Sequence, residues 1–257
     1  MARSVVSEIK RDHIHKLIAD GHRVDGRAWD EFRNISIQTN VVETAEGSSR
    51  VKIGNTEVIV GVKMTVGEPF SDTPNRGVLT TNAELIPMAS PNFESGPPDE
   101  NSIELARVVD RGIRESQMID LEKLCVEPGK KVWINFVDIY VLDFDGNLFD
   151  ACSLGAVAAI KSAIVPASAH GLGEDYPMPI TCTPISVTAV QIENSILVDP
   201  SLDEEMVAAA RLTVTTDDNG DLRAMQKGLR GALTVEQIKT IIDTSRRLGS
   251  EIRKLVG

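Results

Sequence analysis

The chain has 257 residues, of which 42% are apolar and 25% charged, and its formal net charge is −11. This length and composition fit one large or two modest globular domains with a sizeable core, and they exclude a disordered chain. Because nonspecific affinity for nucleic acid comes mainly from neutralising phosphates, an acidic chain is not expected to bind RNA or DNA over its whole surface. Any such contact must be local or shared with a more basic partner.

The three cysteines indicate a reducing compartment. Cys125, Cys152 and Cys182 lie far apart, form no C-x-x-C pair and have no histidine at metal-ligand spacing. We therefore expect reduced thiols in a cytoplasmic protein, and no bound metal. The most apolar run, residues 154–165, is shorter than a membrane span and contains Lys161. We expect no membrane-spanning segment and, from the mixed charges of the first residues, no secretory signal.

Glycine-containing stretches do not match the phosphate-binding loops of nucleotide enzymes. Gly171-Leu172-Gly173 lacks the third glycine of a dinucleotide loop, and Gly129-Lys130 lacks the glycine spacing and the hydroxyl of a P-loop. Residues 143–147 resemble the start of a calcium loop, but the glycine comes too early and Leu154 stands at the twelfth position, so a tight turn is the better interpretation. We expect no cofactor.

The N-terminal segment, residues 1–22, is predicted to be a helix that runs from a cap at Ser4 to about Asp20 and stops at Gly21. Its spacing places five apolar residues on the expected buried side. These residues are Val5, Ile9, Ile14, Leu17 and Ile18.

Alternating apolar residues predict a sheet in the first half of the chain, which we assign to residues 23–165. The predicted strands lie around residues 35–37 and 51–53, and at 56–66, 78–86 and 131–143. Gly54-Asn55 is expected to form the hairpin turn before the third strand. Small residues within 149–165 predict a helix that packs closely against the sheet and is closed by Pro166.

Residues 100–120 are predicted to form a helix between these strands. Asp99, Asn101 or Ser102 can cap its first amides. Four apolar residues recur at three- and four-residue steps, which is typical of a side that packs on a core. They are Ile103, Ala106, Val109 and Ile113.

The same helix carries a stripe of three arginines. Arg107, Arg111 and Arg114 fall at i, i+4 and i+7, so their guanidinium groups are expected along one side. Each guanidinium offers several donors in a planar fork, and such a stripe is able to hold successive phosphates. The alternative is a solvated face on which acidic neighbours neutralise the arginines. Those neighbours are Glu104, Asp110 and Glu115.

The proline-rich segment 166–184 is the candidate boundary before the second half, residues 166–257. Strands are expected at residues 185–192, 196–198, 211–216 and 221–226, and a final helix begins at Thr234, with Gln237 completing a capping box. The apolar stripe expected on that helix is Val235, Ile238, Ile241, Ile242, Leu248, Ile252 and Leu255. Strands followed by helices twice over predict an α+β fold of two βα-rich halves, with mixed sheets packed against helices.

A cluster of acidic residues in the second half has two interpretations. It is either a metal or acid–base site, or the solvated first turn of a helix that ends near Ala210. No second carboxylate follows a few residues later, where Arg211 stands instead, so a catalytic pair is hard to build locally. The cluster consists of Asp199, Asp203, Glu204 and Glu205.

Several motifs together resemble the RNase PH-type phosphorolytic ribonucleases. The opening motifs are Arg23-Val24-Asp25-Gly26-Arg27 with Glu31 and Arg33, then Gly47-Ser48-Ser49 and Gly54-Asn55-Thr56. More specific are Asn75-Arg76-Gly77, residues 94–100, residues 107–114, Glu127-Pro128-Gly129 and Asp145-Gly146-Asn147, which look like the non-catalytic RNase PH-like subunit of the archaeal exosome. The resemblance covers nearly the whole chain from about Gly21 and implies an RNase PH-like fold.

The sequence departs from active members of that family at two places. Active relatives carry Gly-Ser/Thr-Arg after an Asp-Gly turn to hold inorganic phosphate, and this chain has Asn147-Leu148-Phe149 there. Their two aspartates, six residues apart, fall by position on Glu205 and Arg211. Because a reversed charge disrupts metal binding and acid catalysis, the resemblance implies that this chain has no catalytic residue and is not itself an enzyme.

The resemblance also implies partners. The family forms a heterohexameric ring of alternating catalytic and non-catalytic RNase PH-like subunits, joined by RNA-binding cap subunits, which degrades single-stranded RNA from its 3' end using phosphate. In that ring we expect Arg107, Arg111 and Arg114 to hold RNA that enters the active site of the neighbouring catalytic subunit. The alternatives are a phosphorolytic exoribonuclease that is active by itself and an architectural spacer that never touches RNA.

Overall fold

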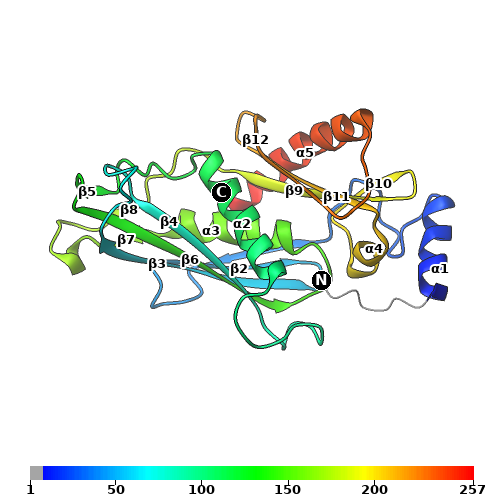
Figure 1. Ribbon diagram of the computed structural model, residues 1–257, viewed down its shortest axis with the longest axis horizontal. Coiled ribbons are helices and arrows are strands. Elements are labelled where there is room, and N and C mark those ends of the chain that lie inside the picture. The colour runs from blue at the N-terminus through cyan, green and yellow to red at the C-terminus, as the bar shows by residue number, and fades with distance from the viewer. Residues whose placement is uncertain (1–7) are drawn as a thin grey trace.

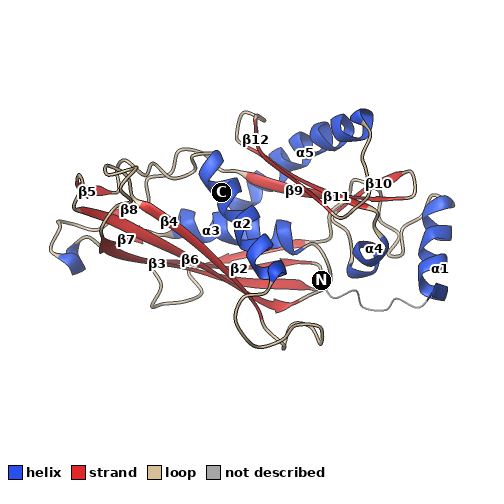
Figure 2. Ribbon diagram, in the orientation of Figure 1, coloured by secondary structure: helices blue, strands red, loops and turns tan. Residues whose placement is uncertain are grey.

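Two main β-sheets and two layers of helices alternate in the computed structural model, which describes residues 8–257 (Figures 1 and 2), and a two-stranded sheet is added beside them. The larger sheet contains β1 (Ile35–Thr39), β2 (Gly47–Ile53), β3 (Thr56–Gly67), β4 (Val78–Leu85), β5 (Cys125–Glu127) and β6 (Lys131–Asp143). The smaller sheet contains β9 (Ile185–Ile192), β10 (Ser195–Val198), β11 (Ala210–Thr216) and β12 (Leu222–Gly228). The helices are α1 (Glu8–Ala19), α2 (Glu100–Glu115), α3 (Leu148–Ser162), α4 (Leu202–Val207) and α5 (Val235–Val256).

The strand order of the larger sheet is β1-β2-β3-β6-β4, with β5 paired to β6, and that of the smaller sheet is β10-β9-β11-β12. Only β4 runs parallel to its neighbour, so the larger sheet is mixed and the smaller one antiparallel. The β2–β3 hairpin turns at Gly54-Asn55 as predicted, with Ile53 opposite Thr56. Alternate residues of β3 are fully buried, which confirms the period of two.

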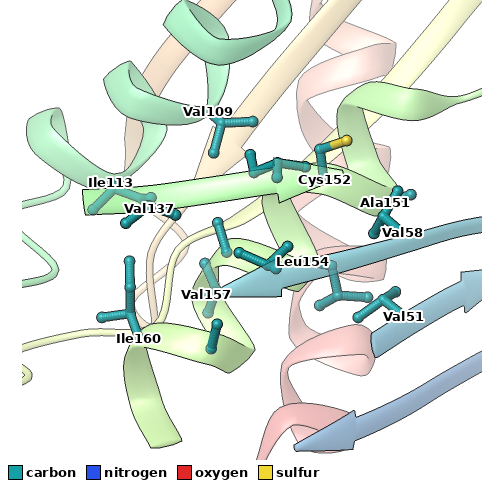
Figure 3. Packing of buried hydrophobic residues seen from close by; sticks show 14 of the residues in the cluster. Val51, Val58, Val109, Ile113, Val137, Ala151, Cys152, Leu154, Val157 and Ile160 are labelled. Carbon is teal, nitrogen blue, oxygen red and sulfur yellow. The ribbon is translucent and has the colours of Figure 1, made fainter. Parts of the chain in front are cut away.

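Helix α3 lies between the two sheets, since it contacts β2 and β3 on one side and β9 on the other. Its close approach requires small residues: a Cβ on Gly155 would lie 2.8 Å from Cγ2 of Val60. Figure 3 shows side chains of α3 beside Val51 and Val58 of the larger sheet. A helix buried on both sides is apolar all round, which is why its sequence shows little amphipathic pattern.

Helix α3 ends earlier than its sequence predicted. It stops at Ser162, and Ala163 is already extended with ψ 140°. Residues Ile164–Val165 form β7, which pairs with β8 (Tyr176–Pro177), and a short 3-10 helix (Ser168–His170) lies between them. The prediction of a helix up to Pro166 was wrong because β-branched residues here find a strand partner in the proline-rich segment.

The outer helices bury less of their apolar surface than predicted. On α1, Ile14 and Ile18 pack on the second sheet, but Ile9 is 83% exposed, and Ser4 and Val5 lie outside the described residues. Helix α5 covers β9 and β11 through Ile241, Leu248 and Ile252. Val235 and Leu255, in its first and last turns, remain exposed.

The capping box at the start of α5 is present as predicted, since the side chains and amides of Thr234 and Gln237 bond reciprocally. The helix that was one alternative for the acidic cluster is present as α4, with acidic residues in its first turn, but it ends at Val207 and not near Ala210, which already begins β11. Among residues 8–257, no helix combines the length and the apolar character needed to cross a lipid bilayer.

Candidate functional site

Helix α2 presents the arginine stripe and is fixed at its start by one of the three predicted caps. The carboxylate of Asp99 accepts a hydrogen bond of 2.8 Å from the amide of Ser102. The helix ends at Glu115, not at residue 120, because Gln117 adopts a left-handed φ of 56° and the chain turns back. Residue Ile119 then forms a bridge with Ile180.

Three of the four apolar residues predicted for the buried side of α2 are buried. Ala106, Val109 and Ile113 pack in the core, and Figure 3 shows Val109 and Ile113 beside Val137 of β6. Ile103 is 48% exposed, so that assignment was wrong. Position 103 lies one turn before Arg107 and shares the arginine side of the helix.

The three predicted arginines line one groove of about 630 Å³. Arg107, Arg111 and Arg114 are all exposed, and the same groove is also lined by four acidic residues, Glu100, Glu104, Asp110 and Glu115. Thr81 of β4 and Gln226 of β12 lie at its sides, so the groove follows α2 between the edges of the two sheets. The structure thus brings the whole stripe together on one open face.

The arginines of the groove differ in their partners. Arg114 is tied to Asp110 by two hydrogen bonds of 2.9 and 3.0 Å and donates a third to the carbonyl of Leu79. The bonds to Asp110 raise the pKa of Arg114. Within residues 8–257, the side chains of Arg107 and Arg111 form neither a hydrogen bond nor an ion pair, although both residues lie inside helix α2. Of the three arginines, Arg114 is the one whose pairing matches the neutralised-face alternative, since its partner Asp110 is one of the acids named there.

The positions at which the family resemblance predicts a departure from active relatives also meet in space, at the start of α3. Gly146, with φ of 88°, lets the preceding turn touch the backbone of α4, because a Cβ there would lie 2.5 Å from the amide of Leu202. The amide of Asn147 donates a 2.9 Å hydrogen bond to Oε1 of Glu205. The guanidinium of Arg211 lies 3.9 Å from the centre of the Phe149 ring, a cation–π contact.

Arg211 is held on its other sides as well. One of its terminal nitrogens donates to Glu104 of α2 at 2.6 Å. A Cβ on Gly228 of β12 would lie 2.6 Å from the same guanidinium, so the strand backbone packs closely against it. The acid on α2 that was expected to neutralise the arginine stripe is thus engaged by Arg211.

A buried ion-pair network surrounds this region and joins the two halves. Asp199 accepts hydrogen bonds from Arg33, Arg27 and Asn147, at 2.8, 3.0 and 2.7 Å for the shortest contact of each. Burial opposes the charge of Asp199, but the bonds from Arg33 keep its pKa below the ordinary value. Glu204 pairs with Arg23 at 2.6 Å, with both side chains fully enclosed.

This network changes the interpretation of the acidic cluster. Asp199 and Glu204 are neither solvated nor arranged as metal ligands, because arginines of the 23–33 segment saturate them. Within residues 8–257, no three His, Cys, Asp or Glu side chains are grouped so that they could hold a metal ion. The pair formed by Arg23 and Glu204 joins residues about 180 positions apart. The sequence signal for this pair was the arginine-rich motif at residues 23–33.

Asp150, one turn into α3, is a buried carboxylate that sequence reasoning missed. Its oxygens accept hydrogen bonds from the amide and hydroxyl of Thr188 at 2.9 and 2.7 Å, and from the side chain of Asn147. Burial outweighs these bonds and raises the pKa of Asp150 to about 7. Burial likewise raises the pKa of Glu205 to about 7.

Comparison with known proteins assigns the family. The 3' exoribonuclease family matches in two parts, domain 1 over residues 31–166 and domain 2 over residues 182–247. The chain is 56% identical over 254 residues to the exosome complex component Rrp42 of Methanocella arvoryzae, covering 99% of this chain and 98% of the relative. It is 53% identical over 250 residues to the Rrp42 of Thermoplasma acidophilum, covering 97% and 96%.

Solved structures support the same family assignment. A chain of the Archaeoglobus fulgidus exosome with RNA bound to the active site superposes with a TM-score of 0.94 at 53% identity, covering 96% of this chain and 97% of that one. A chain of an archaeal exosome core gives a TM-score of 0.90 at 49% identity, covering 97% and 96%. These matches confirm the predicted RNase PH-like α+β fold, and the chain belongs to the 3' exoribonuclease family of RNase PH-like proteins.

Proposed function

We propose that this chain is a non-catalytic subunit of an archaeal exosome, which binds RNA and supports a catalytic partner in phosphate-dependent 3'-to-5' degradation. Relatives at 50% identity or more over nearly the whole chain bear the name of an exosome component. The proposal that the chain is non-catalytic rests on the arrangement of residues at the start of α3. There a buried arginine stacks on an aromatic ring where active relatives have an aspartate and a phosphate grip.

Three features of that region oppose catalysis. Arg211 brings a positive charge to the position of an acid, and its bond to Glu104 fixes it there. Glu205 is bonded to the amide of Asn147, and within residues 8–257 it belongs to no group of three acidic, histidine or cysteine side chains that could hold a metal. Phe149 offers a ring where a phosphate-binding arginine is expected.

The groove on α2 supports a role in RNA binding. Its two unpaired arginines, Arg107 and Arg111, are one helical turn apart, a spacing that suits neighbouring phosphates of one strand. Arg114 lies one turn further and is our third RNA-binding residue. The overall charge of −11 makes a partner with more positive charge necessary for strong binding. We therefore place the groove at the contact with a catalytic RNase PH-like subunit in an alternating heterohexameric ring, whose cap subunits bind the incoming RNA in the cytoplasm.

The test of inactivity compares the chain alone, the catalytic partner alone and the assembled ring. Phosphate-dependent release of nucleoside diphosphates is expected from the ring and not from this chain alone. Release by the purified chain, abolished by Glu205→Gln, would contradict the proposal and establish the exoribonuclease that is active by itself. Co-purification with the partner as one large assembly is the first result expected.

A further inference from the structure

Two acids in the groove on α2 each stand about one helical turn before an arginine, and they behave differently. Asp110 pairs with Arg114, four residues later, by two hydrogen bonds of 2.9 and 3.0 Å. Glu104 stands three residues before Arg107, a spacing at which helical side chains also meet, with the acid ahead of the cation. This second pair is absent, since in the part of the chain that the structure describes the side chain of Arg107 forms no hydrogen bond or ion pair.

The difference between the two acids comes from Arg211, which reaches α2 from the second sheet. A terminal nitrogen of Arg211 in β11 donates to Oε1 of Glu104 at 2.6 Å. The carboxylate that is placed to pair with Arg107 is thus engaged by a cation from another element.

Arg211 is held in place by its other neighbours. Its guanidinium lies 3.9 Å from the centre of the Phe149 ring. A Cβ added at Gly228, its cross-strand neighbour, would lie 2.6 Å from a terminal nitrogen of that guanidinium. The side chain of Arg211 is 9% exposed and that of Glu104 39%. An ion pair with a side chain that is already fixed costs less conformational entropy, so Glu104 pairs with Arg211 and not with the exposed Arg107.

We propose that Arg211 is a positioning residue for the groove on α2: by engaging Glu104, it keeps Arg107 free to contact an RNA phosphate. The inference rests on the proposed RNA-binding function, and it adds a role to a residue that this function connects only with the absence of catalysis. Without Arg211, the Glu104 carboxylate pairs with Arg107, and RNA has to displace it before a phosphate binds there.

The test measures RNA binding by the assembled ring as a function of salt concentration. Arg211→Met removes the cation and keeps an unbranched side chain against Phe149. It should weaken binding about two- to five-fold, the loss that competition from an exposed ion pair causes, and lower the slope of log affinity against log salt concentration by up to about 0.7. Adding Glu104→Gln to this variant should restore both, because no carboxylate is left to occupy Arg107.

The matched control is Glu100→Gln, which removes an acid that lines the same groove one turn before Glu104. Combined with Arg211→Met, it should not restore the native slope. A cycle with Arg107→Ala separates the inference from a loss of positive charge that acts through space. Once Arg107 is removed, Arg211→Met should have no further effect on affinity or slope.

Glu104→Asp tests the inference without a change in β11, so its result does not depend on the folding of Arg211→Met. The charge is the same, but the shorter side chain retracts the carboxylate by about 1.5 Å from the fixed Arg211 and leaves it within reach of Arg107. Binding should weaken as in Arg211→Met, whereas Glu104→Gln alone should bind RNA at least as tightly as the native ring.

Native affinity and slope in either Arg211→Met or Glu104→Asp would overturn the inference, and so would a loss in Arg211→Met that Glu104→Gln does not restore. In those cases a weaker Arg107→Ala ring would still support the proposed RNA-binding function. A ring whose affinity does not change with Arg107→Ala would overturn the role of Arg107 in RNA binding and this inference with it.

Discussion

The groove on α2 and the polar cluster at the start of α3 lie on neighbouring helices but hold charge in opposite ways. In the groove, Arg107 and Arg111 are exposed and unpaired. In the cluster, Asp199 and Arg23 are enclosed and fully bonded. Unpaired charge at a surface is available to a ligand, whereas paired charge in the interior fixes the fold. The comparison separates the surface that we propose to bind RNA from a buried network that stabilises the fold.

The largest expected effect comes from breaking the buried network. Asp199→Ala leaves Arg33 and Arg27 without their shared carboxylate, and we expect a loss of about 3–5 kcal/mol in the free energy of unfolding. Urea denaturation measures it. The matched control is Asp203→Ala, which removes a partly exposed acid paired with Lys10 and should cost at most about 1 kcal/mol. Equal losses of stability in Asp199→Ala and Asp203→Ala would contradict the difference between the buried and the exposed ion pairs.

The pH dependence of stability tests the burial of Asp150. Its pKa is about 7 in the folded chain against 3.8 for the ordinary group, so between these values the folded chain keeps a proton that the unfolded chain releases. The contribution of Asp150 to the free energy of unfolding is therefore fully present below pH 3.8. This contribution decreases by up to about 4 kcal/mol as the pH rises from 3.8 to 7. Urea melts at pH 5 and pH 8 should show a smaller difference for Asp150→Asn than for the native chain. If Asp150→Asn and the native chain show the same difference in stability between pH 5 and pH 8, a group other than Asp150 causes the pH dependence.

A smaller effect is expected at the stacked arginine. Arg211→Ala removes the cation–π contact with Phe149 and the bond to Glu104, at a cost of about 1–3 kcal/mol in the free energy of unfolding. Phe149→Leu keeps an apolar side chain but loses the ring, so it should cost less. A double-mutant cycle gives the coupling between residues 149 and 211, and a coupling of zero would contradict the stacked geometry.

Much of the fold follows from local sequence patterns. The strand at residues 131–143 and the hairpin at Gly54-Asn55 agree with the structure because alternation and turn chemistry are local signals. The predicted end of α3 was wrong because Ile164 pairs with Pro177, and helical periodicity does not show that the proline-rich segment folds back as a strand. Ile103 was misassigned because periodicity alone does not show where the apolar side of a helix stops.

The two sites differ in how far the sequence predicts them. The stripe of Arg107, Arg111 and Arg114 follows from helical spacing alone, and the structure places all three in one groove. The stacking of Arg211 on Phe149 joins residues far apart in the chain and has no local signature. Only the family positions at 147–149 and 205–211 indicated that these segments meet.

The most direct test of the account is the salt dependence of RNA binding by the assembled ring. Each phosphate contact contributes about 0.7 to the slope of log affinity against log salt concentration for single-stranded RNA. Arg107→Ala with Arg111→Ala should therefore weaken binding and lower the slope by about 1.4. Arg114→Ala should have a smaller effect because Asp110 already holds that side chain.

The control for this measurement is Lys239→Ala, which removes an exposed cation from α5, away from the groove. It should leave both affinity and slope as they are. A native slope and affinity for the Arg107→Ala, Arg111→Ala ring would contradict the account and leave an architectural spacer that never touches RNA.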